Sequence, residues 1–197
     1  MSIYIIAADN INRQLVAVTD KRIGRGYFTR AGEMVKWEFD HDNAVKMSRI
    51  NETVFATGAA TEDYGHLFPN ALKLFSHLPT PDIIEEAKKI DRKVDEPADK
   101  NFPYEPAVLF GLYDDRRPFL WCGEKDGTEK LQVVESGKYR VQICGGLDGT
   151  DDKVSGYLKT LLDKKLSWEK IIYNSLQYAT SIDKVISPSY NIVKMSW

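Results

Sequence analysis

Hydrophobic and polar positions along the first 60 residues favour short strands separated by turns. Residues 2–8 are rich in β-branched and aromatic side chains, residues 9–12 form turns readily, and residues 14–19 are again strand-like. Such side chains fit the pleated surface of a sheet, so these runs predict a β-hairpin. Residues 44–50 and 53–57 predict two further strands. The stretch Gly24 to Asp42 is compatible with an irregular excursion or with another hairpin.

A helical period begins after Gly58. Apolar residues recur at steps of three and four, at Tyr64, Leu67, Phe68, Ala71, Leu72 and Phe75. This spacing predicts a helix, and Pro69 inside it predicts a kink or a restart. Pro81 is expected to open a second helix, because proline is favoured in the first helical turn. The following residues 95–106 contain three prolines and are expected to form a loop.

The second half of the chain repeats this order. Four strand-like runs cover residues 107–113, 118–122, 130–134 and 139–143, and two amphipathic helices and a strand over residues 189–197 follow them. Ser167 is a suitable N-cap for the last helix. Runs of strands followed by helix pairs predict an α+β fold of stacked antiparallel sheets covered by helices, and alternating βαβ folds are disfavoured. A length of 197 residues suits one domain over residues 1–197.

Composition narrows the function only slightly. The formal net charge of -2 gives no reason to expect a nucleic-acid partner. No apolar run approaches the ~20 residues that a membrane-spanning helix needs, and the first residues lack the basic start of a secretory signal. The two cysteines, Cys122 and Cys144, have no ligand-like spacing and are expected to be reduced thiols of a cytoplasmic protein, with Cys144 as a small buried hydrophobe. The three histidines show no metal spacing, so neither a metal nor a cofactor is expected.

Several motifs, taken in order, resemble those of proteasome β-type subunits. The run Val16-Ala-Val-Thr-Asp-Lys-Arg22 is similar to the family's second strand, which ends in Ala-Asp-x-Arg, and Lys46 opens a strand as the family's lysine does. The run Val54 to Asp63 resembles the family's strand, glycine and first helix. Cys144-Gly145-Gly146 is similar to its glycine turn, and Asp183 and Ser187 fall near an Asp and a Ser that support its site.

The resemblance covers nearly the whole chain and includes bacterial HslV and the proteasome-like Anbu family. It implies a four-layer αββα sandwich of the N-terminal-nucleophile hydrolase superfamily. Members hydrolyse amides with the side chain of the first mature residue, whose own α-amine, of pKa about 7.7–8.0, acts as the base. Carried over, the resemblance implies Ser2 as nucleophile once Met1 is removed, with the catalytic residues Asp20, Lys46, Asp183 and Ser187 and the supporting residues Arg22, Gly58 and Gly145.

The same resemblance implies a peptidase or amidase in a homo-oligomeric ring or dimer, with peptide substrates and an ATPase partner. Two alternatives stay open. Placing Ser2 at the family's first position needs two additional residues in the turn at Asn10, since otherwise Tyr4 would stand there. Serine in place of the usual threonine also allows a proteasome-like protein without catalysis, acting in assembly or binding. On that interpretation, Ser2 is an ordinary serine at the start of a strand.

Overall fold

A computed structural model describes residues 3–28, 34–58, 62–94, 107–113, 115–123, 129–146 and 149–197. The strands are β1 (Ile3–Asp9), β2 (Gln14–Asp20), β3 (Ile23–Phe28), β4 (Met34–His41), β5 (Met47–Arg49), β6 (Val54–Gly58), β7 (Ala107–Leu112), β8 (Pro118–Gly123), β9 (Glu129–Val133), β10 (Tyr139–Gly145) and β11 (Tyr190–Ser196). The helices are α1 (Glu62–Lys73), α2 (Thr80–Val94), α3 (Thr150–Leu162) and α4 (Trp168–Ile182). None of the described helices is long and apolar enough to cross a membrane.

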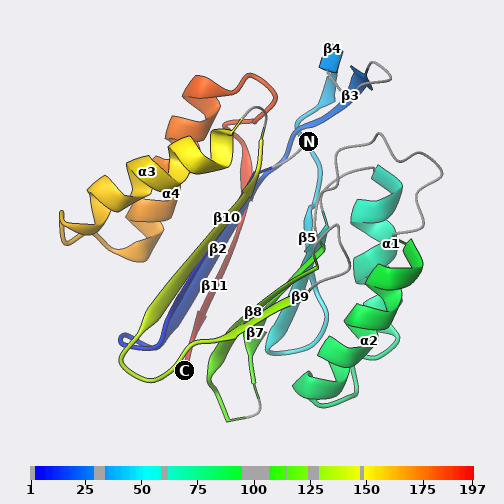
Figure 1. The fold of residues 1–197 in the computed structure, drawn as a ribbon, viewed down its shortest axis with the longest axis vertical. Coiled ribbons are helices and arrows are strands. Elements are labelled where there is room, and N and C mark those ends of the chain that lie inside the picture. The colour runs from blue at the N-terminus through cyan, green and yellow to red at the C-terminus, as the bar shows by residue number, and fades with distance from the viewer. Residues whose placement is uncertain are drawn as a thin grey trace.

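The strands form two larger antiparallel sheets and one separate hairpin. The first sheet has the order β10-β1-β2-β11, and the second has the order β5-β6-β7-β8-β9. The two sheets face each other, with α3 and α4 outside the first and α1 and α2 outside the second (Figure 1). The predicted α+β fold, an αββα sandwich of two antiparallel sheets flanked by helix pairs, is therefore confirmed.

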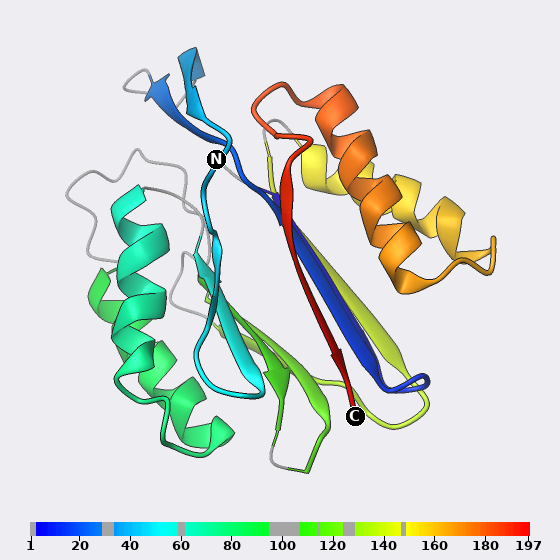
Figure 2. The same ribbon diagram turned by 180° about the vertical axis from the view of Figure 1, so that it is seen from behind.

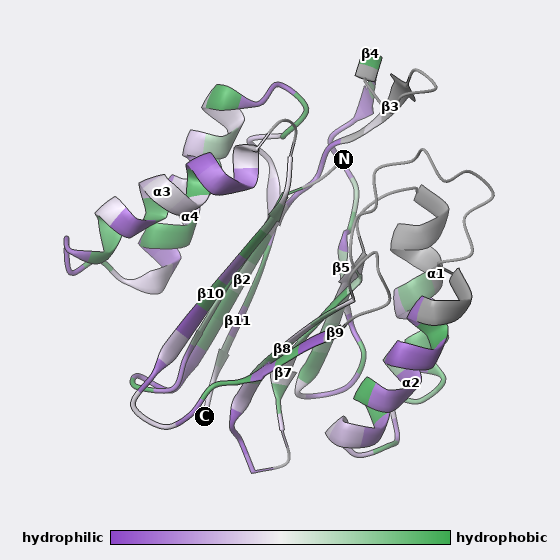
Figure 3. Cartoon of the chain, viewed as in Figure 1, coloured by the Kyte–Doolittle hydropathy of each residue, from purple (hydrophilic) through white to green (hydrophobic). Residues whose placement is uncertain are grey.

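Three apolar clusters hold these layers together. One lies between the first sheet and the pair α3 and α4, and another lies between the second sheet and the pair α1 and α2. The third fills the space between the sheets and contains Tyr4, Ile6 and Phe110. Along β1, Ile3 and Ile5 face the helices while Tyr4 and Ile6 face the other sheet, because successive side chains of a strand point to opposite faces. Figure 3 shows the hydrophobic segments along the strands and on the helix faces that meet them.

The ambiguous stretch Gly24 to Asp42 is a hairpin. Strands β3 and β4 pair with each other and belong to neither larger sheet. The hairpin projects from one end of the sandwich, as the view from behind also shows (Figure 2). Two exposed apolar side chains of β4, Val35 and Phe39, lie on it.

Two details of the expected local structure differ from what is observed. Of the kink or restart expected at Pro69, the restart is wrong, because helix α1 continues through this proline. Phe68 and Leu72 on either side of this proline are fully buried in one cluster, so tertiary packing supports a continuous helix. The strand expected over residues 44–50 is reduced to Met47–Arg49. The backbone of Ala44 instead bonds to Lys21 and to the Asn191 side chain, which takes it out of the ladder.

The remaining elements agree with the sequence within one or two residues. Ser167 is the N-cap of α4, and its side chain accepts a hydrogen bond from the Lys170 N–H. The predicted proline-rich loop over residues 95–106 lies outside the described residues.

Candidate active site

Asp20, the last residue of β2, is the centre of a buried polar cluster. Its side chain is fully buried and accepts four hydrogen bonds. Oδ1 accepts from the Ile3 N–H at 3.0 Å and from Lys46 Nζ at 3.0 Å. Oδ2 accepts from the Arg22 N–H at 3.0 Å and from the Ser187 N–H at 3.3 Å. One carboxylate thus joins four separate segments of the chain.

The Lys46 side chain forms a buried ion pair with Asp20. Only 8% of the Lys46 side chain is exposed, and none of the Asp20 side chain is. A buried charge is stable only when it is paired and hydrogen-bonded, which is the state of both groups here. The segment before Lys46 is held from two sides, since the Ala44 N–H bonds to the Lys21 carbonyl and the Asn191 amide donates to the Ala44 carbonyl. The ammonium group is therefore fixed in position.

The register of the first hairpin decides which residue adjoins this ion pair. Tyr4 lies opposite Thr19, and the hairpin turn covers residues 10–13. The Tyr4 side chain is buried in the apolar cluster between the sheets. The Ile3 N–H contacts the same Asp20 oxygen as Lys46, and the residue directly before Ile3 in the chain is Ser2. Ser2 itself lies outside the described residues.

Arg22 closes the base of the β3–β4 hairpin beside the cluster. Its guanidinium makes two parallel bonds to Asp42, at 2.9 and 3.1 Å, and donates to the carbonyls of Lys184 and Ile186. The hydrogen bonds from Arg22 hold the pKa of Asp42 below its usual range, despite the opposing effect of burial, and the Ser187 side chain adds to the lowering. Arg22 also lies over the Phe39 ring at 5.2 Å. A bidentate ion pair of this kind fixes the orientation of the two side chains in addition to pairing their charges.

Asp183 belongs to a neighbouring group at the end of α4. Its Oδ2 accepts from the Thr150 hydroxyl at 3.0 Å, and its Oδ1 accepts from the Val185 N–H at 3.0 Å. The turn at Gly145 and Gly146 packs against this group, and a Cβ on Gly146 would lie 2.6 Å from the Thr150 Cβ and 3.1 Å from the Asp183 Oδ2. Both glycines have positive φ, 98° and 87°. This turn needs residues without a side chain.

The glycine turn and the Asp20 cluster meet at the start of β1. Gly145 on β10 pairs with Ile3, whose N–H bonds to Asp20. Ser187 is fully buried, and its hydroxyl accepts from the Ser189 N–H at 2.9 Å. Five of the residues named from the sequence therefore lie around one point, namely Asp20, Arg22, Lys46, Gly145 and Ser187. Asp183 adjoins them through Gly146, whereas Gly58 is the last residue of β6 and lies opposite Ala107.

Sequence reasoning missed three residues that complete this arrangement. Asp42 pairs with Arg22, Thr150 with Asp183, and Asn191 with the backbone before Lys46. None of them belongs to a motif, and their partners lie 20, 33 and 147 positions away. No short-range pattern indicates these contacts, because each of them joins segments that are far apart in the chain.

The cluster places a fixed ammonium group close to a backbone N–H and to a glycine turn. Such groups stabilise negative charge that develops on an oxygen atom. Within the described residues, no group of three or more His, Cys, Asp or Glu side chains could hold a metal ion.

Comparison with known proteins gives a match in structure alone. No family model matches the sequence, and no curated protein sequence matches it. Among solved structures, eukaryotic HslV from Trypanosoma brucei is similar to it, with a TM-score of 0.63 and 15% sequence identity over 98% of this chain and 99% of that chain. At this identity the match shows a shared fold, so the chain has the proteasome-like fold of HslV.

Proposed function

We propose that this chain is a peptidase or amidase that uses an N-terminal nucleophile, Ser2 after removal of Met1. The observation that carries the proposal is the buried Asp20–Lys46 ion pair at the start of β1. Asp20 Oδ1 bonds both Lys46 Nζ and the Ile3 N–H, so the ammonium group adjoins the place where the chain continues to Ser2. The HslV-like fold agrees with this chemistry.

In the proposed reaction, the Ser2 hydroxyl attacks the carbonyl carbon of an amide. The free α-amine of Ser2 takes the hydroxyl proton, for which its pKa of about 7.7–8.0 is suited, and passes it to the leaving amine. Water then hydrolyses the ester formed on Ser2. Lys46 stabilises the developing negative charge by remaining an ammonium, and Asp20 keeps it charged because an opposite charge within about 4–6 Å favours the ionised form.

The remaining site residues have supporting roles in this proposal. The turn at Gly145 and Gly146 supplies a backbone N–H to the oxyanion, because it lies beside Ile3 and admits no side chain. Asp183 holds that turn through its hydrogen bond with the Thr150 hydroxyl. Ser187 holds the segment after α4 through its hydrogen bond with the Ser189 N–H. Arg22 fixes the hairpin base, and Gly58 ends β6.

We further propose that the chain acts in the cytoplasm, as one domain over residues 1–197 in a homo-oligomer, with peptide substrates and an ATPase partner. Size-exclusion chromatography with light scattering tests the assembly, since a stable monomer near the chain mass of 22.5 kDa contradicts it.

The catalytic part is tested with two forms of the protein, one beginning at Ser2 and one retaining Met1. The probe is a peptide epoxyketone, whose carbonyl and epoxide react with the hydroxyl and the α-amine of one residue. We expect an adduct on Ser2 in the first form, found by peptide mass spectrometry. The Met1-retaining form and Ser2→Ala should give none, because each lacks one reacting group.

Lysine variants test the role of the ion pair. Lys46→Ala should slow labelling about 10²–10³-fold, the usual effect of losing one group that stabilises an oxyanion. Lys138→Ala removes an exposed lysine from the turn before β10 and should label at the wild-type rate. Absence of an adduct on the form beginning at Ser2, or equal labelling when Met1 is retained, refutes the mechanism and leaves the non-catalytic assembly or binding role.

A further inference from the structure

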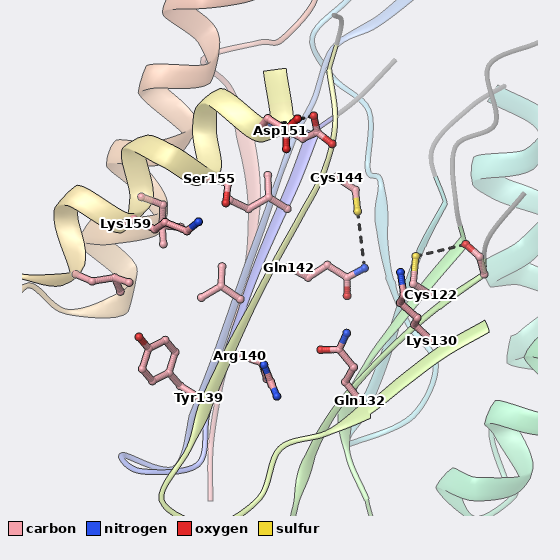
Figure 4. A pocket seen from close by; sticks show the side chains of 16 residues that line it. Cys122, Lys130, Gln132, Tyr139, Arg140, Gln142, Cys144, Asp151, Ser155 and Lys159 are labelled. Carbon is pink, nitrogen blue, oxygen red and sulfur yellow. Dashed lines mark hydrogen bonds between the residues drawn. The ribbon is translucent and has the colours of Figure 1, made fainter. Parts of the chain in front are cut away.

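The two cysteines of the chain meet between the sheets. Cys122 lies on β8 of one sheet and Cys144 on β10 of the other, and both belong to the apolar cluster that fills the space between them. Both are free thiols. They also line a cavity of about 750 Å³ at the edge strand β10. Figure 4 shows the two side chains directed toward the same space from facing strands.

Each thiol has specific polar contacts. The Cys144 Sγ accepts a hydrogen bond from Gln142 Nε2 at 3.7 Å and lies in the same cluster as Cys122 and Tyr4. The Cys122 Sγ donates to the Gly123 carbonyl at 3.4 Å. The two thiols face the same cluster and the same cavity from strands of different sheets, and this placement brings them together as candidates for a disulfide across the sandwich.

The two cysteines differ in exposure and acidity. Cys122 is 6% exposed, while Cys144 is half-buried at the cavity. The contact with Cys122 lowers the pKa of Cys144 to about 7, against the opposing effect of burial and of the Asp151 charge, and contacts with Tyr4 and Gln142 contribute. A thiol with this pKa is substantially a thiolate near neutral pH, and the thiolate is the form that reacts with oxidants.

We propose that Cys144 and Cys122 form an oxidation site for small hydroperoxides, in which Cys144 reacts first and Cys122 closes a disulfide between the two sheets. The peroxide reaches Cys144 through the cavity at β10. The buried Cys122 thiol lies ready as the second partner. This proposal differs from the sequence-based expectation of Cys144 as a small buried hydrophobe, and it does not depend on the proposed hydrolase activity.

The proposed oxidation proceeds in two steps. The Cys144 thiolate attacks one oxygen of the peroxide, the O–O bond breaks, and Cys144 becomes a sulfenic acid while hydroxide or alkoxide leaves. The Cys122 sulfur then attacks the Cys144 sulfur, the S–O bond breaks, and one water leaves with the Cys122 proton. Both sulfurs are oxidised by one electron each, and the peroxide takes up both electrons.

The disulfide would link the first sheet to the second directly beside the glycine turn. Gly145, which follows Cys144, pairs with Ile3 at the start of β1. Oxidation would therefore fix the β10 end of that turn relative to β8 and join the two halves of the sandwich covalently.

The experiment treats the full chain with hydrogen peroxide and measures free thiols and intact mass. We expect the wild type to lose both thiols, to lose the mass of two hydrogens while remaining a single chain, and to recover both thiols with dithiothreitol. Cys122→Ala should stop at the sulfenic acid, trapped on Cys144 by dimedone. Cys144→Ser should leave Cys122 unmodified at the same peroxide dose, and circular dichroism should show that both variants are folded.

Several results would overturn the proposal. These are a wild type that keeps both thiols, disulfides formed only between chains, or a dimedone adduct on Cys122 in the Cys144→Ser variant. If the single variants do not fold, peptide mapping of the oxidised wild type decides the matter. It must find the Cys122–Cys144 linkage for the proposal to stand.

Discussion

Asp20→Asn preserves the shape of the side chain at the centre of the buried cluster and removes its charge. Each oxygen of Asp20 accepts two hydrogen bonds, from Ile3 and Lys46 on one side and from Arg22 and Ser187 on the other. Whichever carboxylate oxygen is replaced by the amide NH2 group, the two protein donors that bonded to this oxygen then face another donor in place of an acceptor. The Lys46 ammonium also loses its counter-charge while remaining buried. The variant should therefore be strongly destabilised.

The expected loss is about 3–5 kcal/mol, the usual cost of breaking a buried ion pair by removing one partner. Typical domains have a total stability of about 5–15 kcal/mol, so this loss is a large part of it. Urea unfolding followed by tryptophan fluorescence measures it. With an m-value of about 2 kcal/mol/M, the midpoint should fall by roughly 1.5–2.5 M.

Two further variants separate charge from general damage. Asp40→Asn neutralises an exposed aspartate of β4 and should leave the midpoint unchanged within error. Lys46→Met combined with Asp20→Asn removes both charges, and the double variant should lose less stability than the sum of the single ones, since no buried charge then lacks a partner. A midpoint shift for Asp20→Asn no larger than that for Asp40→Asn would refute the reasoning.

Two other predictions concern the glycine turn and the first hairpin. Gly146→Ala should cost about 1–3 kcal/mol more than Gly149→Ala in urea unfolding. Both glycines have positive φ, but only a Cβ on Gly146 would meet Thr150, and equal costs would show that steric overlap is unimportant. Burial raises the pKa of Asp9, but hydrogen bonds from Asn12, Trp168 and the turn outweigh it and lower this pKa. The ionised Asp9 side chain therefore stabilises the fold at pH values above the unfolded-state pKa of about 3.9. This stabilisation is lost as pH falls through the lower folded-state pKa. The difference in unfolding free energy between wild type and Asp9→Asn should narrow below about pH 4, and a difference independent of pH would contradict this.

Periodicity along the sequence predicted most of the elements and their order. Strand and helix periods depend on residues two to four positions apart, so they are visible in a short window. Ser167, for example, caps α4 as expected, because its bond to the Lys170 N–H spans only three residues. The order of strands and helix pairs was enough to predict two stacked antiparallel sheets.

Local rules failed where distant segments supplied the decisive contacts. Pro69 lies within a continuous helix because the residues on both sides of it pack into one core. The strand at Met47–Arg49 is short because Lys21 and Asn191 take the backbone bonds of Ala44. In both cases the competing interaction comes from another element, and a local pattern carries no information about it.

The candidate site was only partly determined by sequence. Resemblance selected Asp20, Lys46 and Ser187, but it left open whether Ser2 or Tyr4 stands at the first position. The pairing of Tyr4 with Thr19 and the Ile3 bond to Asp20 came only from the structure, because strand alignment depends on tertiary pairing and not on composition. The placement of Cys122 and Cys144 in one cluster likewise arises only when β8 and β10 face each other across the sandwich.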